Sequence, residues 1–270
     1  MLLDAVNSIY SGGIDPSAHV QVIVVDNNSP DGSAEALAER FPQATLIANR
    51  ENIGYAGGNN QAIKVAKAPY ILLLNPDVLI PSGGLDRALK FMDEHAEAGA
   101  LGVRQVHTDG KLQASVRGFP SPLSIFWELL ALARLFPQSR LFGAYRMTWF
   151  NYNAVAEVDQ PMGTFLLIRK TVMDEIGSLD ERFPIFFNEV DWCLRCKRAG
   201  WKIFFDPAVE IVHYGGASTA QVGAAMAWES RRGLLAFYRK HYSAWKYAPL
   251  RAMISVVSWP HAWLQARKRS

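Results

Sequence analysis

Two aspartates of this sequence follow apolar runs, and each could bind a ligand. Asp77 follows the run 70–74 in the motif Asn75-Pro76-Asp77, and Asp26 follows the β-branched run 20–25. A hard divalent cation that bridges two phosphates takes oxygen ligands, often one or two carboxylates together with water and the phosphates themselves. Asp77 stands on a proline-stiffened turn and fits that need. The alternative for both aspartates is a plain turn or a helix cap.

Two carboxylates, Glu189 and Asp191, open a predicted helix within the aromatic segment 186–192. A carboxylate among aromatic side chains can have its proton affinity raised, as a general base requires. The alternative is that both are acids favoured by the dipole of a first helical turn. His213 ends an apolar run before a glycine turn, where it could bind a metal or a diphosphate, or serve only the structure.

Polar residues near Asp26 and in the segment 52–60 suit a nucleotide. Asp31 and Ser33 can form the local caps after the run 20–25, which leaves Asp26 free to accept hydrogen bonds from a pyrimidine base. The glycine-rich segment 52–60 leads into a predicted helix, whose free N–H groups attract phosphate. Its spacing is neither a P-loop nor a dinucleotide motif, and it could instead allow close packing of helix and sheet.

The elements that must position these residues alternate between strand and helix. Near-continuous apolar strands indicate a parallel sheet covered on both faces. In open α/β sheets, ligands bind beyond the carboxyl ends of the strands, where the candidate residues stand. We therefore expect an α/β fold with a doubly wound, mostly parallel, Rossmann-like sheet. The expected strands are 20–25, 45–48, 70–74, 163–168, 202–205 and 209–213, and the expected helices include 2–10, 34–41, 124–135, 170–176 and 189–199.

Composition excludes several classes of protein. The 270 residues carry a formal net charge of +3, too small to indicate nucleic acid as a partner, and half of them are apolar, as in globular domains. No apolar stretch reaches the ~18–20 residues of a membrane-spanning helix, and no signal peptide is visible, so we expect a cytoplasmic protein. Cys193 and Cys196 fit a reducing compartment and lack further zinc ligands nearby, so we expect inert thiols.

The order of the motifs carries more information than any one of them. The motifs lie at 24–29, 52–60, 72–77, 163–169 and 189–191, with further matches at 179–183, 198–201 and 213–218. This succession resembles family 2 glycosyltransferases over about residues 2–245. It looks closest to the bacterial rhamnosyltransferase-like branch, which builds O-antigen, capsule or cell-wall glycans.

The resemblance implies a GT-A fold, an inverting mechanism, and Mg²⁺ or Mn²⁺ as cofactor. It implies a nucleotide-diphosphate sugar as donor, with rhamnose as the expected sugar, and a polysaccharide or lipid-linked glycan as acceptor. Asp77 would bind the metal, and His213 would approach the metal or the diphosphate. Glu189 would be the base that takes a proton from the acceptor hydroxyl, supported by Asp191. The residues expected around the nucleotide sugar are Asp26, Asn28, Gly54, Asn59 and Asn75.

Two departures from the family pattern keep other interpretations open. The chain begins in the helix that should follow the family's first strand, and the family's usual Glu-Asp pair is Asn188-Glu189 here. One alternative is therefore a catalytically impaired or non-catalytic relative that lacks the first nucleotide-binding strand. The other is a sugar nucleotidyltransferase, which should show a glycine-rich loop with a basic residue after its first strand.

The C-terminal segment differs from the rest in charge and aromatic content. We expect a glycosyltransferase domain over 1–226 and a basic, amphipathic helical tail over 227–270, where arginines and lysines alternate with tryptophans. A basic helix with tryptophans on its apolar side can lie in a membrane interface. We therefore expect peripheral contact with the inner face of the cell membrane, and the alternative is a helical appendage packed on the catalytic domain.

Overall fold

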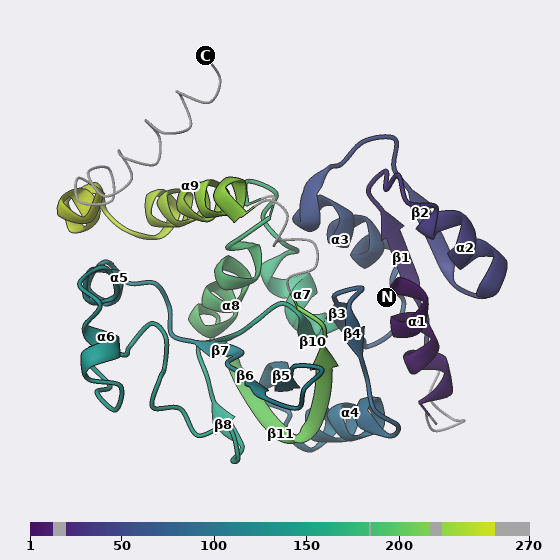
Figure 1. The fold of residues 1–270 in the computed structure, drawn as a ribbon, viewed down its shortest axis with the longest axis horizontal. Coiled ribbons are helices and arrows are strands. Elements are labelled where there is room, and N and C mark those ends of the chain that lie inside the picture. Colours follow the sequence, from purple (N-terminus) through teal and green to yellow (C-terminus); the bar gives the residue numbers. More distant parts are fainter. Residues whose placement is uncertain (13–19, 184, 216–222, 252–270) are drawn as a thin grey trace.

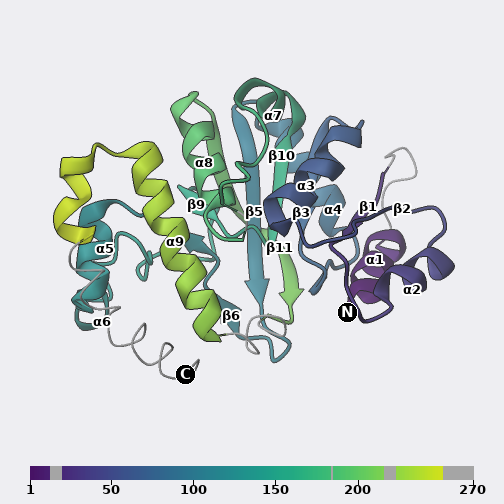
Figure 2. The same cartoon turned by 90° about the horizontal axis from the view of Figure 1, so that it is seen from above.

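A computed structural model describes residues 1–12, 20–183, 185–215 and 223–251, and its core is a mixed seven-stranded sheet (Figures 1 and 2). β5 and β11 are parallel, while β10 runs antiparallel to both of its neighbours and β4 antiparallel to β11. β3, β5 and β11 thus point the same way, as predicted for a mostly parallel sheet, whereas β10 and the short strands β4, β6 and β8 run in the opposite direction. The strand order is β3 (Tyr70–Leu74), β10 (Phe165–Arg169), β5 (Ala98–Val106), β11 (Lys202–His213) and β4 (Val78–Leu79), with β6 (Leu112–Gln113) beside β5 and β8 (Ala156–Glu157) beside β11.

The N-terminal part forms a second, two-stranded parallel sheet. β1 (Ile23–Asp26) pairs with β2 (Thr45–Ala48), so that Asp26 stands opposite Ala48 at the carboxyl end. α2 (Ser33–Arg40) connects the two strands, and α3 (Gly54–Val65) follows β2. The prediction that Ser33 caps α2 is wrong: the helix already includes Ser33, and Gly32 precedes it with a φ of 73°, a conformation that glycine adopts without strain.

Helices cover both faces of the larger sheet, because apolar side chains alternate along its strands. Leu101 and Leu167 face a core cluster with α1 (Leu2–Ser11) and α4 (Gly84–Glu94). Their neighbours Ala100 and Ile168 face the opposite cluster, which contains side chains of α7 (Lys170–Ile176) and α8 (Asn188–Arg198). The expected two-sided burial of the strands is therefore confirmed.

β11 is one strand of twelve residues, where two short strands were expected. Between Asp206 and Glu210, β11 advances four residues while β5 advances only one, from Val103 to Arg104. Pro207, which has no N–H to donate, lies within this irregularity. Three extra residues reverse the alternation: Phe205 faces the α8 side, whereas Ile211 faces the α4 side.

The expected helix 124–135 is two helices, α5 (Pro122–Leu129) and α6 (Leu132–Leu135). They are separated at Ala131, whose positive φ of 56° breaks the helical path. The Ser121 hydroxyl caps α5 by accepting a hydrogen bond from the N–H of Ser124, so the helix begins at Pro122, two residues before the start that the sequence suggested. The small strands β7 (Val116–Arg117) and β9 (Gln160–Pro161) pair beside this region.

α9 (Gly223–His241) packs against α8, and the helical residues 244–251 lie beside α5 (Figures 1 and 2). Phe237 and Tyr238 of α9 are fully buried, in the same cluster as Phe187 and Val190. A Cβ on Gly233 would come within 2.7 Å of the Phe187 ring, so this glycine permits the close approach. Over these residues the tail is a helical appendage packed on the rest of the chain, which was the alternative to membrane contact. Residues 252–270 lie outside the described part.

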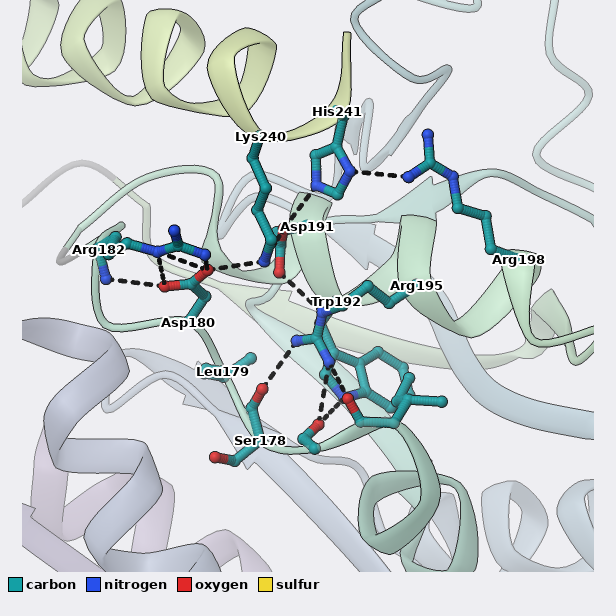
Figure 3. A network of polar contacts seen from close by, with 12 residues as sticks. Ser178, Leu179, Asp180, Arg182, Asp191, Trp192, Arg195, Arg198, Lys240 and His241 are labelled. Carbon is teal, nitrogen blue, oxygen red and sulfur yellow. Dashed lines mark hydrogen bonds and ion pairs between the residues drawn. The ribbon is translucent and has the colours of Figure 1, made fainter.

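A buried carboxylate joins α8 to α9. Asp191 is fully buried, and its oxygens accept hydrogen bonds from Arg195 at 2.9 Å and His241 at 2.6 Å, with Lys240 also at 2.6 Å (Figure 3). Arg198 can only donate, so the Nδ1 of His241 accepts from it at 2.9 Å and Nε2–H donates to Asp191. Burial raises the pKa of Asp191, but the hydrogen bonds from His241, Lys240 and Arg195 outweigh burial and hold that pKa below its usual value.

No helix among the described residues has the length and apolar content to span a membrane.

Replacing the buried carboxylate should separate α9 from α8. We expect Asp191→Asn to lower the free energy of unfolding by about 3 kcal/mol at neutral pH, because Arg195 and His241 lose their charged partner and Lys240 loses one of two. The pKa of Asp191 is depressed in the folded state. Its contribution to the free energy of unfolding is therefore fully present at pH values above the unfolded-state pKa of about 3.9, and it is lost as the pH falls through the folded-state pKa. Urea unfolding at neutral and acidic pH measures this.

The matched control for that variant is Asp174→Asn, which removes an exposed carboxylate paired with Lys170 one turn away. Exposed pairs of this kind contribute about 0.5 kcal/mol. If Asp191→Asn were no more destabilising than Asp174→Asn, the buried network would not be what holds α9.

Candidate active site

The ends of β3 and β11 bring two predicted metal-binding residues together. Asp77 lies between β3 and β4, and its Oδ1 is 3.3 Å from Nε2 of His213, the last residue of β11. The pairing of His213 with Val78, next to Asp77, fixes this approach. The other ring nitrogen, Nδ1, is 2.8 Å from Oε1 of Gln113 on β6. The hydrogen bond from His213 lowers the pKa of Asp77, so the carboxylate is ionised at neutral pH.

The chemistry of this pair fits a divalent cation. The amide oxygen of Gln113 accepts from Nδ1–H of His213, so Nε2 is the ring atom that faces Oδ1 of Asp77. An imidazole nitrogen and a carboxylate oxygen at this separation suit a shared cation, because two adjacent ligands of an octahedral ion stand about 3 Å apart at bonds of about 2.1 Å. Among the described residues, no third His, Cys, Asp or Glu joins the pair. Water and donor phosphates would complete the coordination.

Glu189 lies at the start of α8, beside Gly163 and Tyr55. A Cβ on Gly163 would meet Cγ of Glu189 at 3.4 Å and the hydroxyl of Tyr55 at 3.5 Å, so these three groups converge. Tyr55 donates a hydrogen bond to the carbonyl oxygen of Gly163 at 3.1 Å. Burial raises the pKa of Glu189 to about 6. Burial and then the charge of Glu189 raise the pKa of Tyr55, which stays a neutral donor.

Backbone contacts place Glu189 and the Asp77–His213 pair along the same edge of the sheet. Asn75, at the end of β3, donates its N–H to the carbonyl oxygen of Thr164 at 3.1 Å. Thr164 directly follows Gly163, against which Glu189 packs. The candidate site therefore has one carboxyl group with a lowered pKa, Asp77, after the end of β3, and one with a raised pKa, Glu189, packed against the segment that leads into β10.

Asp26 and Asn28 shape the turn that follows β1. Both carboxylate oxygens of Asp26 accept hydrogen bonds from the N–H of Ser29, at 3.2 and 3.3 Å. The expectation that Asp31 and Ser33 leave Asp26 free of local capping is therefore wrong, although its remaining lone pairs can still accept from a ligand. Asn28 is exposed, with a positive φ of 66°.

Gly54 and Asn59 lie on α3. Gly54 opens the helix with a φ of 81°, and its N–H donates to the side chain of Asn52 at 2.9 Å. The carbonyl oxygen of Gly54 accepts from the Asn27 side chain at 3.1 Å, which ties α3 to the end of β1. The side-chain amide of Asn59 donates within its own helix, to the Tyr55 carbonyl oxygen at 2.8 Å.

Several residues that complete the site were not singled out from the sequence. Asn27 connects α3 to β1 and accepts from Asn49 at 2.9 Å, while Gln113 orients His213 and Tyr55 borders Glu189. Tyr55 lies inside the glycine-rich segment and could have been noticed as its one aromatic side chain. Gln113 stands in no motif, so no signal in the sequence indicated it.

Two other features contain none of the predicted site residues. Cys193 and Cys196 are free, buried thiols in the core on the α8 side, and burial raises the pKa of Cys196 to about 12, which agrees with the expected inert thiols. A hollow of about 460 Å³ lies between α1 and β4; its lining includes Asn7, Ile80 and Tyr214 but no residue of the predicted site.

Comparison with known proteins finds related transferases. The model of the family described as Glycosyl transferase family 2 matches residues 1–159. An N-acetylglucosaminyl-diphospho-decaprenol L-rhamnosyltransferase of Mycobacterium tuberculosis is 28% identical over 252 residues, covering 86% of this chain and 78% of that protein. The rhamnosyltransferase WbbL of Escherichia coli is 23% identical over 206 residues, covering 73% of each chain.

Solved structures show the same fold. The mannosyltransferase PcManGT from Pyrobaculum calidifontis, solved in complex with GDP-Man and Mn²⁺, aligns with a TM-score of 0.55 at 18% identity, over 95% of this chain and 76% of that one. TarS of S. aureus, residues 1–349, aligns with a TM-score of 0.51 at 16% identity, over 84% of this chain, which spans 60% of that chain. The GT-A fold implied by the motifs is confirmed, and since the family model covers more than half of the sequence, the chain belongs to glycosyl transferase family 2.

Proposed function

We propose that the chain transfers a sugar from a nucleotide-diphosphate donor to a glycan or lipid-linked acceptor, with inversion at the anomeric carbon and with Mg²⁺ or Mn²⁺ at Asp77. The observation that carries this proposal is the pair of differently tuned acidic groups on one sheet edge. Asp77 beside His213 is held ionised, whereas Glu189 has a pKa raised to about 6. Membership of the family supports transfer rather than nucleotidyl chemistry.

At the donor end, the chain would hold a diphosphate between strand ends and the start of α3. Asp77 and His213 would hold the cation, which when bound supplies positive charge to the departing diphosphate. Gly54 opens α3, whose first-turn N–H groups favour phosphate oxygens, and Asn59 lies in the second turn of the same helix. Asp26 and Asn28, on the turn after β1, would contact the nucleotide, and Asn75 would lie beside Asp77 near the sugar phosphate.

At the acceptor end, Glu189 would act as general base. As the acceptor hydroxyl oxygen forms a bond to the anomeric carbon, its proton moves to Glu189 and the bond between that carbon and the diphosphate oxygen breaks. A base with a pKa near 6 is ionised at neutral pH and still has useful proton affinity. Asp191 would act only through position, because its oxygens are bonded to α9 and Arg195.

The names of the relatives support a narrower proposal for donor and acceptor. Two of them are named as rhamnosyltransferases, and one of these names a diphospho-decaprenol acceptor. We therefore assign rhamnose as the donor sugar and a polyprenyl-diphosphate-linked glycan as the acceptor. Such an acceptor lies in a membrane, so the enzyme would work at the inner face of the cell membrane by peripheral contact.

Donor binding should depend on the metal through Asp77. We expect calorimetry with a panel of nucleoside diphosphates to show binding that Mn²⁺ strengthens, and Asp77→Ala to weaken that binding about tenfold or more because the diphosphate loses its bridging cation. The matched control is Asp31→Ala, which removes an exposed carboxylate that bonds only within its own turn, to Ser33. Binding that neither Mn²⁺ nor Asp77→Ala changes would contradict the assignment of the metal site.

Transfer should depend on the ionised form of Glu189. We expect Glu189→Gln to lower kcat about 100- to 10,000-fold while donor binding is unchanged, because the amide cannot take the acceptor's proton. In the unaltered enzyme kcat/KM should rise with pH through an apparent pKa of about 6, since protonation disables the base below that value. Steady-state transfer assays across pH measure both effects.

The control for the base is Glu94→Gln, which removes an exposed carboxylate at the end of α4. A Glu189→Gln variant that kept more than about a tenth of the activity would show that another group takes the proton.

A further inference from the structure

The region of α5 and α6 exposes large apolar side chains that lie close together in the sequence. Leu135 and Phe136 are 69% and 52% exposed, and Leu129, Leu130 and Leu141 are also exposed. We call these five residues, together with Arg134 and Arg140, the α5–α6 surface. Isolated exposed apolar residues are ordinary, but several within one short segment mark a site of interaction.

The charges of this segment favour an anionic partner. Between 121 and 150 the basic residues are Arg134, Arg140 and Arg146, and the one acid is Glu128. Glu128 is already paired with Arg146 at 2.5 Å. Arg140 lies over the ring of Trp149 at 4.7 Å, and Arg134 has no ion-pair partner in the described part of the chain. Two positive charges therefore accompany the exposed leucines.

The apolar side chains stand on a packed support. The ring of Phe142 contacts both Phe136 and Trp127, with each pair of ring centroids 5.4 Å apart. The hydroxyl of Thr148 donates to the carbonyl oxygen of Pro137 at 2.6 Å, and the N–H of Gly143 donates to that of Ser139 at 2.9 Å. The exposed side chains are thus presented by a defined surface.

The same region adjoins the site of Glu189. Ile125 of α5 packs in one cluster with Phe187 and Val190, the residues on either side of Asn188-Glu189. Tyr145, which follows α6, is close enough to Glu189 that the carboxylate charge contributes to raising its pKa, after burial. A partner that binds the α5–α6 surface would therefore lie near Glu189, the proposed base.

We propose that the α5–α6 surface docks on a membrane that contains anionic phospholipid, with its leucines and Phe136 in the interface and Arg134 and Arg140 at the headgroups. Apolar side chains with basic neighbours bind such interfaces through burial and charge together. One part of the inference rests on the proposed function: a lipid-linked acceptor would reach Glu189 from the membrane to which the α5–α6 surface is bound. It also moves the expected membrane contact from the tail, whose α9 is packed on the domain, to α5 and α6.

Vesicle binding by the full chain tests this proposal. We expect sedimentation with vesicles of phosphatidylcholine and phosphatidylglycerol to retain the protein, and vesicles of phosphatidylcholine alone to retain much less. Leu135→Ser combined with Phe136→Ser should weaken binding to the anionic vesicles about tenfold or more. Arg134→Gln combined with Arg140→Gln should reduce binding to the level seen with phosphatidylcholine alone.

The matched control is Val155→Ser, which removes an apolar side chain of similar exposure outside the α5–α6 surface and should bind vesicles normally. Circular dichroism melting checks that each variant is folded. Failure of the unaltered protein to bind anionic vesicles, or full binding by the folded Leu135/Phe136 variant, would overturn the proposal. A concentration-dependent dimer that this variant abolishes would overturn it too, because the surface would then join two copies.

Activity separates this inference from the proposed function. With a water-soluble acceptor analogue the surface variants should transfer sugar at the normal rate, and with a lipid-linked acceptor in anionic vesicles their rate should fall. If vesicle binding behaves as expected but no transfer occurs with either acceptor, the docking surface stands and the proposed reaction fails.

Discussion

The arrangement of the site depends on one buried negative charge. Asp191 has no access to water, and an unpaired carboxylate in that position would be very costly, so its cationic and hydrogen-bonding partners must stay in place. Two of those partners, Lys240 and His241, belong to α9, and Arg195 belongs to α8 itself. α9 is therefore held against the start of α8, and Glu189 is held with it.

Three carboxylates of this protein illustrate how surroundings decide the role of one chemical group. The pKa of Asp77 is lowered by His213, that of Asp191 is lowered by its hydrogen bonds despite burial, and that of Glu189 is raised by burial without a cationic partner among its causes. The first suits a metal ligand, the second a structural anchor and the third a base. Acids whose pKa values are pushed apart in this way are typical of catalytic sites.

The sequence predicted the parts of the fold that local pattern controls. The apolar runs became β1, β2, β3 and β10, and the acidic pair opened α8, because burial and helix-start preferences act over a few residues. The pairing of Asp77 with His213 was expected from the family and not from spacing, since 136 positions separate them. No local pattern indicated which partner each side chain would contact. Neither the bond of Asp191 to α9 nor the orientation of His213 by Gln113 could be read from the residues around them.

The irregularity in β11 fixes which way the last residues of that strand face. Side chains alternate along a strand, so the three extra residues between Asp206 and Glu210 turn Ile211 toward the α4 side and set the direction of His213. The number of residues in this segment therefore decides which face of the sheet the last side chains of β11 point to. Insertions or deletions of two residues there would keep the direction of His213, whereas a change of one residue would turn His213 away from Asp77 and disrupt the proposed metal site without replacing either residue.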